Sequence, residues 1–413
     1  MVLLSSLPIP FHLNNAPSIP ASLVPCTASH LWQALSWAEP LLTIYHGDGV
    51  VSLDFRITIC DCLTDHTFPV YINLPIGAFT FAGIVAFFHS PARKSEAKVS
   101  WKERANQFDI YGTIVFLPAI ISLLLALQWG GSTYAWGSGR IVALLVLFGV
   151  LIAVFIAIQF WKGDYATVPI RILSQRSIAG SAWYAFCLGA TFFVMIYWIP
   201  VWFQAIKGTS ATKSGIDSLP LIVSLVLCNI ISGVGTTKLG YYTPFFYIST
   251  VLMALGAGLL TTWKTNTGHS MWIGYQIVFG FGVGFGMQQA LICAQTVLPI
   301  VDVPVGTAMM IFFQTMGGSI FLSVAQNIFT NKLLQGVIAT VPGIDPSIVM
   351  HSGATDLKTN IPPRFLAAVQ VAYNHALTQT WYVSVAMACV SVFGVVWIEW
   401  KSVKGKKLDP VAA

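Results

Sequence analysis

The chain has 413 residues, of which 56% are hydrophobic and only 9% are Asp, Glu, Lys or Arg. A soluble domain carries about 25% charged residues, so this composition cannot cover a water-facing surface and indicates an integral membrane protein. The formal net charge is +6, but the basic residues fall in short connectors and in the C-terminal tail rather than on one face, which argues against nucleic acid as a partner.

Residues 1–68 differ from the rest of the chain. Five prolines between Pro8 and Pro25 interrupt any early helix. No apolar run in this segment reaches the roughly 20 residues that span a bilayer. The first basic residue is Arg56, so the basic start of a secretory signal is also missing. We expect 1–68 to be an irregular segment that does not cross the membrane.

From Val70 onward, nine apolar runs are long enough to cross a bilayer. Backbone N–H and C=O groups inside lipid must be paired within the segment, and the runs lack the period-two alternation of barrel strands, so each should be a helix. The sequence therefore predicts an all-α, polytopic membrane helix bundle with about nine transmembrane helices. The runs cover 70–89, 108–129, 140–161, 178–203, 217–236, 243–262, 271–294, 304–329 and 380–399.

The connectors between these runs set the expected orientation. A cytosolic C-terminus places more Lys and Arg residues inside, including those of the basic tail 401–413. The longest connector, 330–379, then becomes an outer loop, and its prolines favour a loop with only partial structure. Most of the aromatic residues that crowd 178–203 are expected to face lipid or the membrane interface.

Uncharged polar side chains distinguish several of the runs. No Asp, Glu, Lys or Arg lies in the central part of any run, whereas amides recur. Gln288 and Gln295 are seven positions apart and therefore share one side of a helix. Such amides either line a polar cavity that binds an organic molecule or join helices by hydrogen bonds. The candidates for a substrate cavity are Gln288, Gln289, Gln295, Gln314 and Asn229.

Glycines form a second pattern. Four of them alternate along 280–286, and a glycine pair lies in the next run. Small residues four positions apart let helix backbones approach closely. The pattern fits static packing and equally fits helices that slide past each other. The candidates for packing elements of moving helices are Gly280, Gly284, Gly317 and Gly318.

Residues for catalysis or metal binding do not converge in the sequence. The eight histidines lie in the N-terminal region, in connectors or near run ends, and the seven cysteines form no C-x-x-C or Cys/His cluster. A phosphate-binding G-x-x-x-x-G-K-[ST] loop is also missing. The sequence thus predicts no enzyme, no catalytic or metal site and no cofactor.

Five blocks of the sequence resemble one family. They are YINLPIG from Tyr71, SGIDSLPLIVSLVLCNIISG from Ser214, KLGYYTPF from Lys238, GFGVGFGMQQALICAQTVLP from Gly280 and GTAMMIFFQTMGGSIFLSVAQNIF from Gly306. In this order they are similar to fungal drug:proton antiporters of the major facilitator superfamily, in the fourteen-helix branch that includes toxin and secondary-metabolite efflux pumps. The resemblance runs from about Asp65 to the last residue of the sequence.

This resemblance implies a domain organisation. YINLPIG opens the sixth helix of the family, so 69–90 would be that helix, 108–161 two additional linker helices and 178–400 the C-terminal six-helix half, followed by a cytosolic tail. The first five helices of the family have no counterpart in this sequence, and with them go the acidic residues expected to couple proton movement. We therefore expect an N-terminally truncated major facilitator fold.

The resemblance also implies a function. It predicts a multi-pass plasma-membrane transporter that exports an amphipathic organic compound, such as a toxin, drug or secondary metabolite, against proton entry by alternating access. The expected partners are the lipid bilayer, the small organic substrate and protons. The alternative is a truncated, non-transporting remnant or misannotated gene product of such a transporter, since one half supplies only one wall of the site.

Overall fold

The structure is a computed structural model, and it describes residues 77–81, 83, 109–341, 349, 354, 357 and 361–403. The chain divides into two units, Met1–Ser100 and Trp101–Ala413. In the first unit the described residues are helical and belong to the expected helix 69–90. The rest of that helix, the segment 1–68 and most of the tail 401–413 lie outside the described residues.

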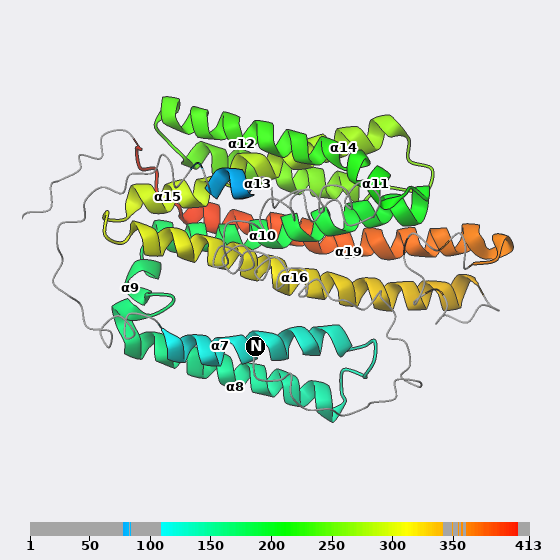
Figure 1. Cartoon of the computed structure of the whole chain (residues 1–413), viewed down its shortest axis with the longest axis horizontal. Helices are drawn as coiled ribbons and strands as arrows, with labels where there is room; N and C mark the ends of the chain where they lie inside the picture. Colours follow the sequence, from blue (N-terminus) through cyan, green and yellow to red (C-terminus); the bar gives the residue numbers. More distant parts are fainter. Residues whose placement is uncertain are drawn as a thin grey trace, which may run out of the picture. The chain divides into compact units, whose positions relative to one another are not determined.

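Helices make up the described part of the second unit (Figure 1). A 3-10 turn, η2 (Gly163–Tyr165), and a π-helical turn, η3 (Phe203–Lys207), follow α8 and α10. No β-strand occurs among the residues that the structure describes, in agreement with the predicted all-α class. The α-helices are α7 (Ile110–Trp129), α8 (Gly139–Lys162), α9 (Ile170–Leu173), α10 (Arg176–Trp202), α11 (Ala211–Asp217), α12 (Leu219–Leu239), α13 (Thr243–Leu260), α14 (His269–Gly286), α15 (Gln289–Val297), α16 (Val303–Thr340) and α19 (Pro363–Trp397).

Eight helical segments in the described part of the chain are long and apolar enough to cross a membrane. In these segments α10 continues through η3, and α14 and α15 together form one span. They correspond to eight of the nine predicted runs, and the run 70–89 lies outside the described residues except for 77–81 and 83. The prediction of a polytopic helix bundle is confirmed.

Local sequence signals explain where several helices begin and end. Asp109 precedes α7, and its carboxylate accepts a hydrogen bond from the backbone N–H of Gly112 at 2.8 Å. Ser138 precedes α8 in the same role. Gly163 ends α8 with φ 61°, and Gly240 ends α12 with φ 81°, a left-handed conformation that costs little only at glycine.

Helices α16 and α19 are longer than the predicted runs. α16 continues to Thr340 and α19 begins at Pro363, so both ends of the expected loop 330–379 are helical. The two helices pack against each other in this region, where the rings of Phe329 and Tyr373 lie 5.0 Å apart. Their buried residues recur about once per turn, so a search for unbroken apolar runs does not detect them. The remaining part of that loop lies almost wholly outside the described residues.

The last six spans form two triplets in chain order, and the first helix of each triplet packs against the two later helices of the other (Figure 1). The first triplet in chain order is α10, α12 and α13, and the second is α14 with α15, then α16 and α19. α10 packs mainly against α16 and α19 of the second triplet, whereas α14 packs against α12 and α13 of the first. The last members, α13 and α19, also touch. Such an exchange is the pattern of an internal structural repeat.

The aromatic residues of α10 correct one prediction. Tyr184, Trp198 and Trp202 are buried, although lipid or interface contact was expected for most of this group. Trp183 and Tyr197 are exposed, at 43% and 40% of their surface. Because α10 is enclosed by α16, α19 and α15, its buried aromatic rings fill space between helices, whereas Trp183 and Tyr197 remain exposed.

A hydrogen-bonded cluster around Asp109 fixes one end of the α7–α8 pair. The Asp109 carboxylate accepts bonds from Gln159 Nε2 of α8 at 2.8 Å and from the Thr167 backbone N–H and hydroxyl at 3.0 and 2.9 Å. Gln159 Oε1 in turn accepts the backbone N–H of Val168 at 2.9 Å. The cluster therefore joins the start of α7, the end of α8 and the segment that leads to α9.

A second polar contact holds the other end of this pair. The Asn327 amide of α16 donates to the carbonyl oxygen of Leu127 at 2.7 Å and to that of Gly130. Between the two ends, the ring of Phe116 on α7 lies 5.3 Å from that of Phe312 on α16. Asn327 thus pairs carbonyl groups at the end of α7 that would otherwise lack partners in this turn.

Candidate functional site

The span formed by α14 and α15 is interrupted at Met287 and Gln288. α14 ends at Gly286 and α15 begins at Gln289, although the helix-type bond from Met287 N–H to the Val283 carbonyl persists at 3.0 Å. Four glycines end α14, and each glycine weakens a helix by up to about 1 kcal/mol relative to alanine. Met287 and Gln288 keep right-handed helical backbone angles, with φ of −60° and −91°, so the span is locally weakened here but not unwound. This weak point is the first feature of the candidate site.

Two of the candidate amides lie on one open side of this span. Gln288 and Gln295 are both exposed, as expected for residues seven positions apart on a helix. Phe281 is also exposed, and Phe285 is half-buried, and both are spaced to continue the same side toward the start of α14. The open side therefore combines amide groups that can donate and accept hydrogen bonds with aromatic surface.

Gln289 and Gln276 have a different environment. Gln289 is fully buried, and its Oε1 accepts a hydrogen bond from the Thr236 hydroxyl of α12 at 3.3 Å. Gln276 is also buried and donates its Nε2 to the Asp217 carbonyl at 3.1 Å. These contacts join helices, which is the alternative that the sequence left open for the amides.

Asn229 and Gln314 lie on other helices. Asn229 is half-buried on α12, and Gln314 is half-buried on α16. Among the described contacts, neither side chain is joined to an amide of α15. The candidate residues are therefore distributed over three helices, and the structure brings only Gln288 and Gln295 to a common open side.

The glycines of α14 contact a helix on each of two sides. A Cβ added at Gly280 would lie 2.0 Å from the Ser224 hydroxyl oxygen, and one added at Gly284 would lie 2.4 Å from the Leu225 carbonyl, both on α12. A Cβ at Gly282 would lie 2.2 Å from the backbone nitrogen of Met253 on α13. Two-sided close packing of this kind leaves no room for a larger side chain on either side of α14.

The second glycine pair lies where α10 and α16 cross. A Cβ at Gly317 would lie 2.1 Å from the Phe186 carbonyl, and one at Gly318 would lie 2.3 Å from the Phe193 ring. Gly189 of α10 meets α16 in the same way, since its added Cβ would lie 1.9 Å from the Gln314 carbonyl oxygen. All four candidate glycines are therefore packing residues in this structure.

Sequence reasoning missed a buried polar contact between α10 and α13. The hydroxyl groups of Tyr184 on α10 and Ser249 on α13 are 2.6 Å apart, and Ser249 also donates to the Gly282 carbonyl at 2.6 Å. A serine within an apolar run is a weak sign of interhelical bonding, and nothing in the sequence links it to Tyr184.

Charged groups gather at helix ends. Arg171 forms two bonds of 2.9 Å with Asp302, and this contact holds the pKa of the Asp302 carboxyl below its usual value. Glu399 lies 2.8 Å from Lys401, which likewise lowers the pKa of the Glu399 carboxyl. Within the described residues, no three His, Cys, Asp or Glu side chains converge, so no metal-binding group is present there.

The chain has relatives whose names describe membrane transport, although no family model matches the sequence. It is 57% identical over 343 residues to the MFS-type efflux pump MFS1 of Arthroderma benhamiae, which is 83% of this chain and 64% of that protein. It is 46% identical over 348 residues to the MFS-type transporter phomT of Diaporthe leptostromiformis, or 83% of this chain and 58% of the relative. The chain thus spans less than two thirds of the length of these two proteins.

A third relative is covered more fully. The MFS acetylaranotin efflux transporter ataA of Aspergillus terreus is 48% identical over 331 residues, which is 80% of this chain and 74% of that protein. The three relatives are fungal proteins, and each name states transport or efflux.

Proposed function

Because the chain belongs to the fungal efflux pumps of the major facilitator superfamily, we propose that it exports amphipathic organic compounds such as a toxin, a drug or a secondary metabolite. The chain is a multi-pass membrane protein, as the eight long apolar helices among its described residues and its relatives indicate. The names of the relatives, which describe efflux and in one case acetylaranotin efflux, support the proposal.

The open side of α14 and α15 carries the proposal most directly. Gln288 and Gln295 are exposed on one side of a span whose other amides, of Gln276 and Gln289, are buried. Phe281 is exposed on the same side. In lipid alone the exposed amide of Gln288 would be costly, so a cavity that holds water or a polar ligand on this side would stabilise it. Amide and aromatic groups together suit a compound that has both polar and apolar parts.

Alternating access is the proposed mechanism. α14 is held in backbone contact between α12 and α13, whereas α15 packs mainly against α16 and α10. Helices in backbone contact would move as one body, so the break at Gln288 is the proposed bending point between the two groups. Gly280 and Gly284 would keep α14 with α12, and Gly317 and Gly318 would keep α16 with α10.

A substitution tests this assignment. A Cβ added at Gly284 would lie 2.4 Å from the Leu225 carbonyl oxygen of α12, so Gly284→Ala should force α14 away from α12 and reduce transport. Gly258→Ala on α13 is the control, because a Cβ at Gly258 would meet nothing within 4 Å. Unchanged transport by a membrane-inserted Gly284→Ala variant would contradict the assignment of α12 and α14 to one moving body.

Proton antiport completes the proposal and is supported by the family resemblance. Within the described spans no Asp or Glu lies away from a helix end, so carboxylates of these helices are not the proposed proton carriers. Export that continues after a protonophore collapses the proton gradient would contradict antiport. We also propose that the protein lies in the plasma membrane with its C-terminus in the cytosol. Antibody should therefore detect an epitope tag at the C-terminus only after cells are permeabilised.

Export itself is tested in a pump-deficient yeast. Cells that express the 413-residue chain should accumulate less of an amphipathic dye and tolerate more toxin than control cells. Gln288→Ala should change which compounds are tolerated. Gln326→Ala is a matched control because Gln326 is half-buried and bonds Thr330 within α16 at 3.4 Å. Unchanged dye accumulation despite membrane insertion would reject autonomous transport by this chain.

A further inference from the structure

The segment that follows α19 joins four helix ends. The Glu399 carbonyl accepts the Tyr242 hydroxyl at 3.0 Å, and the Glu399 backbone N–H donates to the Ser177 hydroxyl at 3.3 Å. The Val403 backbone N–H donates to the Gly240 carbonyl at 2.8 Å, in the turn between α12 and α13. Because α10 begins, α12 ends, α13 begins and α19 ends here, the segment lies at the level of the membrane surface.

Three exposed aromatic rings from distant parts of the chain gather on this segment. The Trp400 ring lies 6.4 Å from that of Tyr241, in the turn before α13, and 6.4 Å from that of Tyr247, on α13. All three side chains are exposed. Amphipathic aromatic rings at the ends of membrane spans favour the headgroup level of a bilayer, where the ring contacts hydrocarbon and the polar atom contacts water. The rings therefore place the start of the C-terminal tail beside lipid headgroups.

Positive charge collects around the same helix ends. Glu399 lies 2.8 Å from Lys401 and also interacts with Arg176, so its carboxylate neutralises one unit of the local charge. Asp409 is the other acidic residue of this part of the sequence. An excess of basic groups beside a span attracts anionic headgroups. The basic residues are Arg176 at the start of α10, Lys238 in the last turn of α12 and Lys401, followed in the sequence by Lys404, Lys406 and Lys407.

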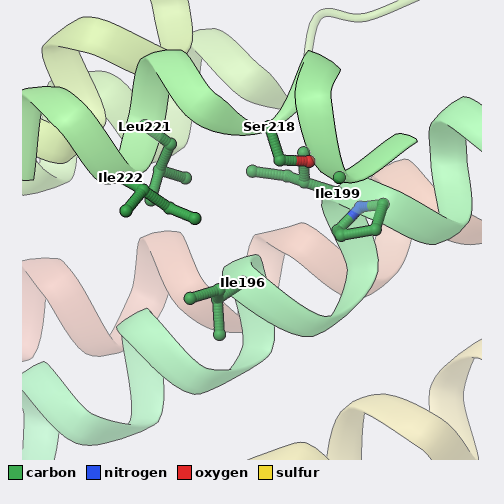
Figure 2. A pocket seen from close by; sticks show the side chains of 7 residues that line it. Ile196, Ile199, Ser218, Leu221 and Ile222 are labelled. Carbon is green, nitrogen blue, oxygen red and sulfur yellow. The ribbon is translucent and has the colours of Figure 1, made fainter. Parts of the chain in front are cut away.

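The opposite ends of α10 and α12 differ from this surface. A pocket of about 120 Å³ lies there between the two helices, with Ile196 of α10 facing Leu221 and Ile222 of α12 (Figure 2). Its lining is apolar except for Ser218, whose hydroxyl donates to the Ser214 carbonyl at 2.8 Å. No charged side chain is among the lining residues, so the pocket offers a phosphate group no partner. The basic residues therefore distinguish the surface around the segment after α19.

We propose that this segment, together with the ends of α10 and α12, binds the headgroup of an anionic phospholipid. Lys238 and Lys401 attract the negative charge of the headgroup, while the ring of Trp400 lies against the upper part of the acyl chains. Binding at this surface goes beyond the proposed export and does not depend on it. Phosphatidylcholine has the same phosphate but no net charge, so the surface should prefer phosphatidylserine.

Native mass spectrometry of the full purified chain in a neutral detergent tests the proposal. The probes are dioleoyl phosphatidylserine and dioleoyl phosphatidylcholine, which share their acyl chains and differ in net charge. Phosphatidylserine should bind at lower concentration, and added salt should reduce the difference. Lys238→Gln with Lys401→Gln should weaken phosphatidylserine binding by about fivefold per lysine and leave phosphatidylcholine binding unchanged. Trp400→Ala should weaken both lipids equally, since the ring contacts the part that they share.

Two further variants supply the controls. Lys213→Gln with Lys264→Gln also removes two exposed lysines, but these lie beyond the opposite ends of α10 and α13, so phosphatidylserine binding should not change. Glu399→Gln releases Lys401 from its ion pair and should make phosphatidylserine bind more tightly. A purely structural role of the segment after α19 would not give tighter binding.

Four results would overturn the proposal. One is equal affinity of the parent chain for the two lipids. Another is the same loss of phosphatidylserine binding in the Lys213 and Lys264 control as in the Lys238 and Lys401 variant. The third is unchanged or weaker phosphatidylserine binding in a folded Glu399→Gln variant. The fourth is displacement of phosphatidylserine by inorganic phosphate at the same concentration, which would assign the surface to a soluble anion.

Discussion

Helices α8 and α10 are both long apolar spans, yet they are buried to opposite extents. Only 11% of the apolar window of α8 is buried, compared with 67% of that of α10. α8 is nevertheless the more apolar of the two. In a chain that spans a bilayer, strong hydropathy therefore marks contact with lipid, whereas protein contact is marked by other residue types.

Small and hydroxylated residues mark the helix that contacts protein. α10 contains Gly180 and Gly189, which meet the backbones of α19 and α16, and Thr191, which bonds the Ser384 carbonyl at 3.3 Å. α8 contains no Ser or Thr, and its internal Gly149 faces open space. The buried surface of α10 depends on close approach of backbones, and α8 is held mainly by α7 and by the cluster around Asp109.

Leucine at one glycine of each helix gives the largest expected difference. Gly189→Leu puts atoms where the Gln314 carbonyl oxygen now lies, so it should separate α10 from α16 and destabilise the protein by more than about 3 kcal/mol. Gly149→Leu should be neutral or stabilise α8 by up to about 1 kcal/mol. Size-exclusion chromatography and thermal unfolding in detergent measure both. Equal loss of folded protein in the two variants would mean that α8 and α10 depend equally on close backbone packing.

Removal of the Asn327 contact should have a smaller and more local effect. Asn327→Leu leaves the carbonyls of Leu127 and Gly130 without this donor, at a cost of about 1 kcal/mol. Hydrogen exchange should become faster at the end of α7 and remain unchanged in α10. Gln326→Leu is the control, since that amide bonds only within α16 among its described contacts. Faster exchange throughout α10 would mean that the α7–α8 pair supports the six-helix body.

The Asp109 cluster should make the attachment of α8 sensitive to acid. Burial raises the pKa of the Asp109 carboxyl, but hydrogen bonds from Gln159, Thr167 and Gly112 outweigh this and hold the pKa below its usual value of 3.8. The stabilisation is therefore present above pH 3.8 and is lost as pH falls through the lower folded-state value. Asp109→Asn should cost about 1 kcal/mol at neutral pH and remove the acid dependence of exchange in α7. An unchanged acid profile in this variant would assign the dependence to another group.

The smallest effect is expected for the exposed ion pair of Arg171 and Asp302. The Arg171 side chain is 54% exposed, so Arg171→Ala should cost less than about 1 kcal/mol despite the two bonds of 2.9 Å. The pKa of the Asp302 carboxyl, now held low by Arg171, should rise toward its usual value. Unfolding at low and high salt measures the cost, which should shrink as salt screens the pair. A larger loss that salt does not reduce would indicate a packing role for Arg171.

The spans themselves could be predicted because bilayer thickness requires long unbroken apolar runs. The break at Met287 and Gln288 could not, since the change of packing partner from α12 to α16 at this point is a tertiary effect. The length of α16 beyond 304–329 was missed for a related reason. Its extra turns are stabilised by α19, which is distant in the sequence.

The candidate amides could be predicted only in part. The seven-residue spacing correctly indicated that Gln288 and Gln295 share an environment, and both are exposed. Gln289 is adjacent in sequence to Gln288 but points about 100° away around the helix, and α12 covers it. The Tyr184–Ser249 contact joins residues 65 positions apart on different helices, so no local pattern predicts it.

The lengths of α16 and α19 have a practical consequence. At about 1.5 Å per residue, their 38 and 35 residues extend about 57 and 52 Å, whereas the hydrocarbon layer is only about 30 Å thick. Gln370 donates to the Ala205 and Ile206 carbonyls of η3 at 3.4 Å, so the turns of α19 before Gln370 continue past the end of α10 and η3. The packed ends of α16 and α19 thus extend beyond the hydrocarbon layer, and an antibody fragment bound to them would add the asymmetric mass needed to align particle images in electron cryomicroscopy.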